Sequence, residues 1–436
     1  MVDYAYVKIW DTLVGVVAWN TQRNLADFQY DKKFLQQNWD LSPLKMPLSG
    51  GDRVYSFPEL LPAKDSAEDT FKGLPGLLAD SLPDKYGNQL IEKWLAQNGR
   101  PPNSMNPVEK LCFIGSRGMG ALEFEPSTHK KQDLFNVSVD HLVNITAQML
   151  HERASFSENI TQETEEAMKR ILTLGTSAGG ARSKAIIAYN PSTGEVKSGQ
   201  TDVPAGFYHY LLKLDGVDAA QFGTSKSYGR VEMAYYLMAI DCGIHMMPSH
   251  LLEENGRAHF LTQRFDREGN STKHHMQTLC AINHYDYNLV GEYSYEQLFQ
   301  TMRLLRLPYP DAEEMFRRMV FNVLARNCDD HTKNFSFLLK QGKRWELSPA
   351  YDLCFAYDPK SIWVSKHSLS INGKRQHFAM EDLLVVAKSM NIKKPERIIS
   401  NTREVIMEWR TYAKKCHVHL ELSTHIEKHI KEVQLA

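Results

Sequence analysis

The segment from Asp329 to Asp352, DDHTKNFSFLLKQGKRWELSPAYD, constrains the fold of this chain more than any other stretch. An apolar, β-prone run from Phe335 to Leu339 is followed by a polar turn, Lys340 to Arg344, and by a second short run from Trp345 to Leu347. Two such runs around a turn that contains glycine predict a β-hairpin. A hairpin returns the chain to its starting end, so we expect the polar side chains that flank its two strands to lie close together.

These flanking residues have the chemistry that phosphoryl transfer requires. Asp329 and Asn334 are five residues apart, which is the interval between the base and the metal-binding asparagine of the protein-kinase catalytic loop. Asp352 lies just beyond the second predicted strand. An amide oxygen and a carboxylate oxygen, completed by phosphate oxygens and water, suit Mg²⁺. We therefore expect Asp329 to act as a general base and Asn334 and Asp352 to bind the metal, although each residue taken singly is explained as a turn cap or a strand end.

Composition indicates a folded protein without a strong charge bias. The chain has 436 residues, of which 42% are hydrophobic, and a net charge of −1. This length predicts two or three domains, and this charge gives no electrostatic footprint for unaided nucleic-acid binding. The six cysteines lack CxxC spacing, and we find neither an export signal nor a run of eighteen apolar residues. These features predict a cytoplasmic protein with reduced thiols and no membrane contact.

The order of the predicted elements divides the chain into three parts. Residues 1–127 read as a small mixed α/β unit with strands around Tyr4 to Trp10 and Leu13 to Trp19. Residues 128–278 are β-rich, and residues 279–436 show helical periodicity outside the hairpin. Other predicted elements are helices at Lys32 to Gln37, Pro83 to Gln97, 137–170 and Gly229 to Cys242, a strand on each side of the glycines near residue 179, a strand through Lys213, and a hairpin from His250 to Arg267.

A glycine-rich turn and a lysine indicate a phosphate-binding site. Gly175, Gly179 and Gly180 lie between two β-prone runs, with Lys184 close behind. Glycines allow backbone N–H groups to approach phosphate oxygens, but such a turn is usually only a turn. It matches neither a Walker A loop nor a dinucleotide fingerprint.

Two further features follow in the order in which they occur in kinases. Lys213 ends a later strand and Glu232 lies on the next helix, where the two could pair, although a lysine at a strand end is commonly just solvated. The sequence QRFD from Gln263 to Asp266 lies where a crossing chain would place backbone groups beside an adenine edge. A turn fixed by an ion pair of Arg264 or Asp266 explains these residues equally well.

Together these motifs resemble the HipA family, the serine/threonine-kinase toxins of bacterial HipBA toxin–antitoxin modules. The resemblance covers nearly the whole chain. Its motifs, in the family's order, are YVKIWDTLVGVVAW, FKGLPGLLADSLPDKYG, GTSAGGARSKA, LLKLDG, QRFDR, DDHTKNFS and LSPAYDLC.

The resemblance implies an α+β, bilobal, protein-kinase-like fold that binds ATP and Mg²⁺. Its mixed α/β N-terminal part would comprise an antitoxin-contacting subdomain, 1–127, and a nucleotide-binding lobe with the glycine-rich loop, 128–278. An all-helical catalytic lobe, 279–436, would carry the hairpin. Asp329 would be the catalytic base, with Asn334 and Asp352 as metal ligands. Nucleotide contacts would come from Gly179, Gly180, Ala181, Arg182, Ser183, Lys184, Lys213, Gln263, Arg264, Phe265, His331, Lys333 and Asn334.

The resemblance also implies autophosphorylation at Ser177, just ahead of the loop. A phosphate there would repel the phosphates of the nucleotide and pull the loop from the site. Without the family, a small residue in a tight turn is the simpler reading. Two departures matter: Asp330 replaces a common glycine, so that only the interval to Asn334 selects Asp329 as the base, and Arg182 and Ser183 are unusual in the loop. Ser183 is therefore a rival phosphosite.

We weigh three functions. The first is an ATP-dependent serine/threonine-protein kinase that acts as a toxin on a translation-related target, in the family glutamyl-tRNA synthetase. It would be neutralised by a dimeric HipB-like helix-turn-helix antitoxin in a complex on operator DNA. The second is a catalytically silent corepressor in that complex, against which the intact Asp329, Asn334 and Asp352 argue. The third is a small-molecule or lipid kinase, because DxHxxN also resembles the loop of lipid kinases.

Overall fold

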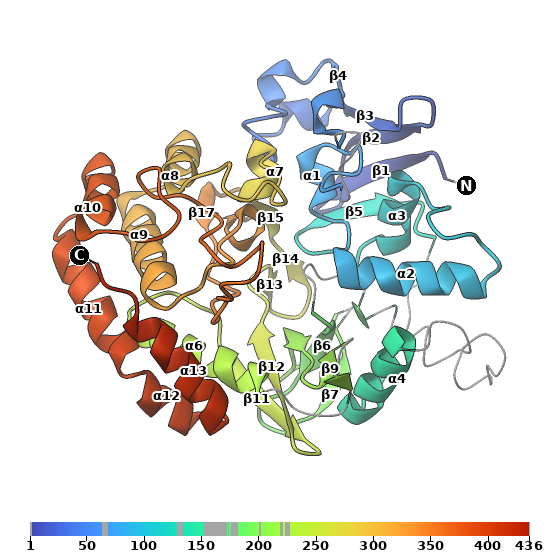
Figure 1. Ribbon diagram of the computed structural model, residues 1–436. Coiled ribbons are helices and arrows are strands. Elements are labelled where there is room, and N and C mark those ends of the chain that lie inside the picture. The colour runs from blue at the N-terminus through green and yellow to red at the C-terminus, as the bar shows by residue number, and fades with distance from the viewer. Residues whose placement is uncertain are drawn as a thin grey trace. The chain divides into compact units, whose positions relative to one another are not determined.

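The computed structural model describes residues 2–62, 69–128, 134–151, 172, 174–175, 182–199, 202–218, 221–222 and 227–435 (Figure 1). The chain divides into two compact units, which are described separately. The N-terminal unit comprises Met1–Lys226, His250–Met276 and Lys340–Gly342. The C-terminal unit comprises Ser227–Ser249, Gln277–Leu339 and Lys343–Ala436.

An antiparallel sheet opens the N-terminal unit, with strand order β4-β3-β2-β1-β5. Its strands are β1 (Tyr4–Ile9), β2 (Thr12–Asn20), β3 (Leu25–Tyr30), β4 (Val54–Tyr55) and β5 (Leu122–Glu125). In β1 the residues Ala5, Val7 and Ile9 are buried whereas Tyr4 and Tyr6 are exposed, as the two-residue period of a half-buried strand requires. The two strands predicted at the start of the chain are therefore confirmed.

Helices and short 3-10 turns complete this part of the chain. They are η1 (Phe34–Gln36), η2 (Leu48–Gly50), η3 (Pro58–Leu60), α1 (Gly76–Ala79), α2 (Lys85–Gln97) and α3 (Pro107–Ile114). The helix predicted at Pro83 to Gln97 is confirmed as α2. The helix predicted at Lys32 to Gln37 is wrong, since only the single turn η1 forms there.

A second sheet, with order β11-β12-β8-β6-β7, carries the predicted nucleotide-binding lysines. Its strands are β6 (Lys184–Tyr189), β7 (Val196–Ser198), β8 (Tyr208–Lys213), β11 (Ser249–Glu254) and β12 (Arg257–Gln263). Two small ribbons accompany it, β9 (Val217–Asp218) with β10 (Gln221–Phe222), and β13 (Arg267–Glu268) with β14 (Thr272–Lys273). The predicted strand through Lys213 and the predicted hairpin from His250 are confirmed as β8 and as β11 with β12.

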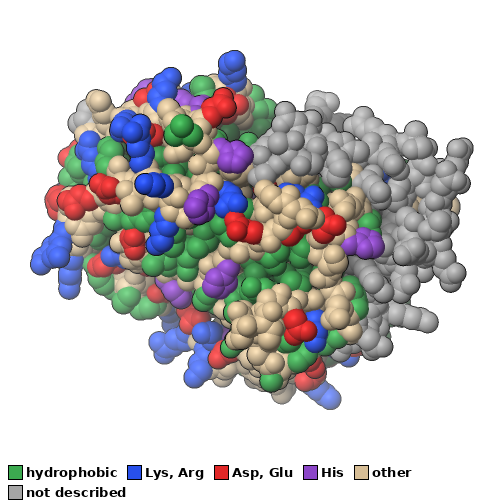
Figure 2. All heavy atoms as spheres, turned by 90° about the horizontal axis from the view of Figure 1, so that it is seen from below, with side chains coloured by type: hydrophobic (Ala, Val, Ile, Leu, Met, Phe, Trp, Pro, Cys, Tyr) green, Lys and Arg blue, Asp and Glu red, His purple; other side chains and the backbone are tan. Residues whose placement is uncertain are grey.

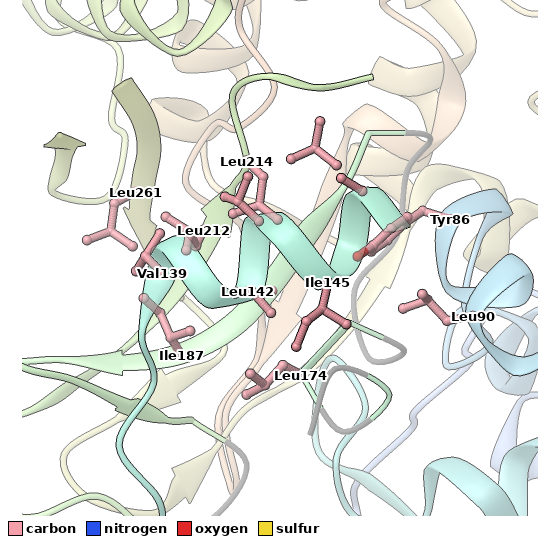
Figure 3. Packing of buried hydrophobic residues seen from close by; sticks show 14 of the residues in the cluster. Tyr86, Leu90, Val139, Leu142, Ile145, Leu174, Ile187, Leu212, Leu214 and Leu261 are labelled. Carbon is pink, nitrogen blue, oxygen red and sulfur yellow. The ribbon is translucent and has the colours of Figure 1, made fainter. Parts of the chain in front are cut away.

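Helix α4 (Val139–His151) packs on this sheet through an apolar face (Figure 3). Leu142 and Ile145 of α4 belong to one buried cluster with Ile187 and Leu212 of the sheet and Leu90 of α2. Burial of each such side chain contributes roughly 1.5–3 kcal/mol. This cluster therefore anchors the strands that end at the candidate nucleotide residues.

The strand predicted before the glycine-rich turn is wrong. Leu172, Leu174 and Gly175 are helical, and the two leucines join the same buried cluster. A Cβ atom on Gly175 would lie 2.6 Å from the Leu90 Cδ1 atom, so the glycine allows close packing against α2. Short apolar runs are ambiguous between strand and helix, and tertiary packing decided this one.

The C-terminal unit is rich in helices and carries the predicted hairpin. Its elements are α6 (Tyr228–Asp241), α7 (Leu279–Asn283), α8 (Tyr295–Leu304), α9 (Tyr309–Leu324), η4 (Thr332–Asn334), β16 (Ser336–Leu339), β17 (Trp345–Leu347), α10 (Met380–Ser389), α11 (Pro395–Met407), α12 (Trp409–Lys415) and α13 (Leu420–Lys431). Strand β15 (His275–Thr278) is the third strand of the hairpin's sheet. Residues 348–379 contain no helix, so helical periodicity does not extend through this whole region.

Charged side chains of both signs are interspersed over the described part of the face in Figure 2. The face shows no large patch of a single sign among the side chains that it describes. Charges of both signs are thus mixed on this face, in keeping with the net charge of −1 of the whole sequence.

Candidate active site

The hairpin predicted from the sequence forms with the expected strands and turn. Strands β16 and β17 pair antiparallel, with Phe337 opposite Leu347 and Leu339 opposite Trp345. Gly342 in the turn has φ +70°, a left-handed conformation that glycine adopts without a steric cost. The short turn η4 leads into β16 and contains Asn334.

The two neighbouring aspartates have different environments. The side chain of Asp329 is 50% exposed, whereas Asp330 is 1% exposed. The Asp330 Oδ2 atom accepts hydrogen bonds from the Tyr295 hydroxyl and from His367 Nδ1, both at 2.8 Å, and its Oδ1 atom accepts one from the Ser368 N–H at 2.7 Å. Asp330 is thus held in the protein interior, and Asp329 is the accessible carboxylate of the pair.

Burial of the Asp330–His367 pair is compensated by charge. Burial by itself lowers the pKa of His367, but the Asp330 carboxylate, with a smaller contribution from Cys328, raises it from 6.5 to about 10. His367 is therefore a cation at neutral pH, and the pair is a buried ion pair.

Asn334 is oriented by the backbone of the turn of residues 329–334, which carries Asp329. Its Nδ2 atom donates a hydrogen bond to the Asp329 carbonyl at 2.6 Å. Because the amide nitrogen is used in this way, the Oδ1 atom is the end that remains for a metal. This contact also fixes the five-residue interval between the two functional groups in space.

Asn334 and Asp352 line the same small pocket of the C-terminal unit. The return of the chain through the hairpin accounts for this meeting of residues that are eighteen positions apart. Asp352 has φ +54°, and a non-glycine residue in the left-handed region is uncommon and costs of order 1–3 kcal/mol. The carbonyl of Asp352 accepts a hydrogen bond from Asn327 Nδ2 at 3.4 Å.

The donor set of this pocket suits Mg²⁺ better than a transition metal. An amide oxygen and a carboxylate oxygen are hard ligands, and Mg²⁺ commonly takes only one or two protein groups, with phosphates and water completing the shell. Within the part of the chain that the structure describes, no three His, Cys, Asp or Glu residues are grouped as a metal site. The residues present therefore fit a magnesium ion that arrives with a nucleotide.

His331 and Lys333 flank the candidate base. The His331 Nε2 atom lies 3.8 Å from Asp329 Oδ1, and His331 Nδ1 accepts a hydrogen bond from the Lys333 N–H at 3.3 Å. The Lys333 ammonium lies 4.7 Å from the centroid of the Tyr287 ring, and the His331 ring lies 5.3 Å from it. Both side chains thus pack on the Tyr287 ring, and His331 lies beside Asp329.

The predicted nucleotide lysines meet in the N-terminal unit. Lys184 at the start of β6 is directly opposite Lys213 at the end of β8, so the two side chains lie on the same face of the sheet. The pair brings two lysines to one end of the sheet, Lys184 buried and Lys213 half-buried, and phosphate binding by them stays a prediction. Arg182 is exposed, and the buried Ser183 hydroxyl donates to the Val217 carbonyl at 3.5 Å.

Several predicted residues cannot be placed against this pair. Ser177, Gly179, Gly180 and Ala181 lie outside the described residues. Glu232 is buried on α6 of the C-terminal unit, whereas Lys213 belongs to the N-terminal unit. Their pairing stays a prediction.

The QRFD segment contains a buried ion-pair cluster. Asp266 accepts from Arg264 at 2.9 and 2.7 Å, from Arg267 at 2.8 Å and from the Gly120 N–H at 2.6 Å. Burial raises the pKa of Asp266, but the two guanidinium groups outweigh it and hold the pKa well below the usual range. The turn fixed by an Arg264–Asp266 ion pair is therefore confirmed, and the adenine contact of Gln263, Arg264 and Phe265 stays a prediction.

Sequence reasoning missed four buried polar residues, of which two, Asn322 and Asn327, line the pocket. Tyr295, Asn322, Asn327 and His367 are buried and hydrogen-bonded with Asp330 or with one another. They come from α8, from α9 and from irregular segments. No spacing rule connects them, so no signal in the sequence could have grouped them.

The comparisons with known proteins identify the family. Residues 176–412 match the model of the HipA-like C-terminal domain, and residues 5–125 match that of the HipA N-terminal domain. Because the first match alone spans more than half of the chain, the chain belongs to the HipA family. A comparison with curated proteins found no match.

Two solved structures are similar to this chain to different degrees. One is the toxin–antitoxin system HipA, HipB and its operator DNA complex from Shewanella oneidensis MR-1, with a TM-score of 0.67, 16% identity and coverage of 98% of this chain and 95% of the other. The other is the Helicobacter pylori proinflammatory kinase CtkA, with a TM-score of 0.31, 12% identity and coverage of 60% of this chain and 94% of the other. A TM-score this low does not establish a shared fold. The likeness to the first structure shows that this chain has a mixed α/β fold similar to that of HipA. No helix in the described ranges is long and apolar enough to cross a membrane.

Proposed function

We propose that this protein is an ATP- and Mg²⁺-dependent serine/threonine-protein kinase that acts as the toxin of a toxin–antitoxin module. One observation carries the proposal. Asn334 and Asp352 line one pocket, and the Asn334 amide donates to the backbone carbonyl of Asp329, whose carboxylate is half exposed. In this proposal the base and the two metal ligands thus come from one turn and from the residues just after one hairpin.

Asp329 is the better candidate for the base. A general base must reach the hydroxyl group of its substrate, and its contribution is roughly 10²–10⁴ in rate. Both oxygens of Asp330 already accept hydrogen bonds, from three donors that include the His367 cation, so this carboxylate is poorly placed to take a proton from a substrate. Its burial supports the choice of Asp329 that the five-residue interval made.

Asn334 and Asp352 would hold the magnesium ion. When bound, the ion supplies positive charge to the phosphate oxygens during transfer. In this proposal the amide nitrogen of Asn334 stays on the Asp329 carbonyl, so metal binding and placement of the base depend on one side chain.

The N-terminal unit would supply the nucleotide contacts. Lys184 and Lys213, on one face of the sheet, would bind phosphates together with the glycine-rich loop Gly179 to Ser183, and Gln263 to Phe265 would lie at the adenine. The bilobal kinase-like arrangement, the three parts 1–127, 128–278 and 279–436, and autophosphorylation at Ser177 belong to this proposal. The engaged, buried hydroxyl of Ser183 makes Ser183 the poorer phosphosite.

The likeness to a HipA structure solved with HipB and operator DNA supports the proposed partners. These are a dimeric HipB-like helix-turn-helix antitoxin, operator DNA bound through that complex, and a protein substrate such as glutamyl-tRNA synthetase. The same likeness favours the second candidate, a catalytically silent corepressor of that complex.

Phosphate transfer separates the two candidates. The purified protein is incubated with γ-labelled ATP and Mg²⁺, alone and with glutamyl-tRNA synthetase, and phosphoamino acids are then identified. Asp329→Ala and Ser177→Ala are compared with Asp358→Ala, which removes an exposed carboxylate outside the pocket. Label on serine or threonine that Asp329→Ala abolishes and Asp358→Ala retains supports the kinase, and loss of the protein's own label in Ser177→Ala supports autophosphorylation at that residue. Nucleotide binding without any transfer supports the silent corepressor. Transfer only to lipid or metabolite would point to the third function.

A further inference from the structure

The polar residues behind the candidate metal pocket form one continuous chain. We propose that four residues, Asp330, Tyr295, Asn322 and Asn327, are positioning residues. They fix the turn of residues 329–334 relative to Asp352. The inference rests on the proposed function, because it assigns these residues a role in the site of phosphate transfer.

At one end the hydrogen-bond chain contacts the turn that carries the candidate base. Asp330 follows Asp329 directly, and its carboxylate receives the Tyr295 hydroxyl, His367 Nδ1 and the Ser368 N–H. The Asn334 amide holds the carbonyl of Asp329 from the other side. The turn is therefore fixed on both sides of the base.

From Asp330 the hydrogen bonds continue towards the proposed metal ligand Asp352, and each donor in this stretch points back towards Asp330. The Tyr295 hydroxyl donates to Asp330, so it accepts from Asn322 Nδ2 at 3.0 Å. Asn322 Oδ1 then accepts from Asn327 Nδ2 at 2.9 Å. Each donor and acceptor sets the orientation of the next amide, and such fully satisfied buried networks rigidify their surroundings.

At the other end the chain reaches the backbone of Asp352. Asn327 Nδ2 also lies 3.4 Å from the Asp352 carbonyl, at a residue whose φ of +54° is costly for a non-glycine residue. A strained conformation persists only where its surroundings hold it. The Asn327 contact is thus placed to keep the Asp352 carboxylate in the pocket.

The location of the chain distinguishes it from an ordinary buried polar cluster. Asn322, Asn327 and Asp330 line the pocket that Asn334 and Asp352 also line. Residues that orient metal ligands in this way typically change metal affinity or activity 10–100-fold when they are mutated. We expect a change of that order here.

The test removes one hydroxyl that belongs to the hydrogen-bond chain and, as a control, one buried hydroxyl with similar partners that lies outside it. Tyr295→Phe deletes the hydroxyl that joins Asp330 to Asn322. Thr301→Val is the control on the same helix, α8, because the buried Thr301 hydroxyl also accepts from an asparagine amide, Asn283, and donates to one acceptor, the Gln297 carbonyl. Asn327→Ala cuts the chain at Asp352 and decides the question if Tyr295→Phe does not fold.

Three quantities are measured for each variant: Mn²⁺ affinity in the presence of ATP by electron paramagnetic resonance, the Mg²⁺ concentration that gives half-maximal phosphate transfer, and thermal stability. We expect Tyr295→Phe and Asn327→Ala to weaken Mn²⁺ binding and raise the Mg²⁺ requirement at least tenfold, and Thr301→Val to change neither. Equal Mn²⁺ affinity in all variants, or losses that follow thermal stability in Thr301→Val as well, would overturn the inference.

Failure of the proposed function has a different signature. If the wild-type protein transfers no phosphate, the kinase proposal fails, but Mn²⁺ affinity still reports on Asp352. A tenfold loss confined to the two chain variants would then support their positioning role, and unchanged affinity would refute it.

Discussion

Replacing Asp329 and Asp330 by asparagine, one at a time, should separate the residue needed for catalysis from the residue needed for stability. Asp329→Asn and Asp330→Asn are nearly isosteric changes at adjacent positions, but one carboxylate is half exposed and the other is buried in an ion pair with His367. We expect Asp329→Asn to lose phosphate transfer with little loss of stability. We expect Asp330→Asn to lose stability first.

The cost of Asp330→Asn follows from the proton affinity of His367. A tenfold change in proton affinity is worth about 1.36 kcal/mol, and the pKa of His367 is raised from 6.5 to about 10. At pH 7 this corresponds to about 4 kcal/mol of stability, since the unfolded histidine is then mostly neutral. The figure agrees with the roughly 3–5 kcal/mol lost when one partner of a buried ion pair is removed. A substitution at the half-exposed Asp329 should stay within about 0.5 kcal/mol.

Differential scanning calorimetry and labelled-ATP transfer measure the two effects. The C-terminal unit falls in the size range of roughly 150–250 residues, for which 1 kcal/mol shifts the melting temperature by roughly 2–4 °C, so Asp330→Asn should lower the melting temperature of this unit by roughly 8–16 °C. Asp329→Asn should melt like the wild type and transfer phosphate roughly 10²–10⁴ times more slowly. The reasoning fails if Asp330→Asn melts with the wild type, or if Asp329→Asn transfers phosphate at the wild-type rate.

Three further outcomes are expected. Asp266→Asn should destabilise the N-terminal unit by about 3–5 kcal/mol, because two buried guanidinium groups lose their shared counter-charge; urea denaturation against an exposed control, Asp358→Asn, checks this. Folding raises the pKa of His367 to about 10, so its contribution to stability is complete below pH 6.5 and is lost as the pH rises to about 10. His367→Gln should therefore make the free energy of unfolding less dependent on pH between these values. An unchanged slope of unfolding free energy against pH would contradict the pairing. Asn334→Ala removes a metal oxygen and the hold on the Asp329 carbonyl, so the Mg²⁺ requirement should rise by about 10–100-fold in a metal titration; a requirement equal to that of the wild type would exclude Asn334 as a ligand.

Much of the local structure could be predicted from the sequence. The hairpin was predicted within one residue at its first strand and without error at its second, because two short apolar, β-prone runs and a glycine turn act between near neighbours. Strand β8 and helices α2 and α6 were predicted for the same reason. The convergence of Asn334 and Asp352 on one pocket also follows from the hairpin, since the chain has to return.

Tertiary structure alone decided the roles of residues whose partners are distant in the chain. Apart from the five-residue interval to Asn334, nothing local distinguishes Asp329 from Asp330. Their environments differ because Tyr295 and His367 enclose one carboxylate and leave the other accessible. The run before the glycine-rich turn became helical because its leucines pack into the cluster that Leu90 joins. Burial and hydrogen-bond satisfaction are properties of the assembled interior, and a sequence pattern records only neighbours along the chain.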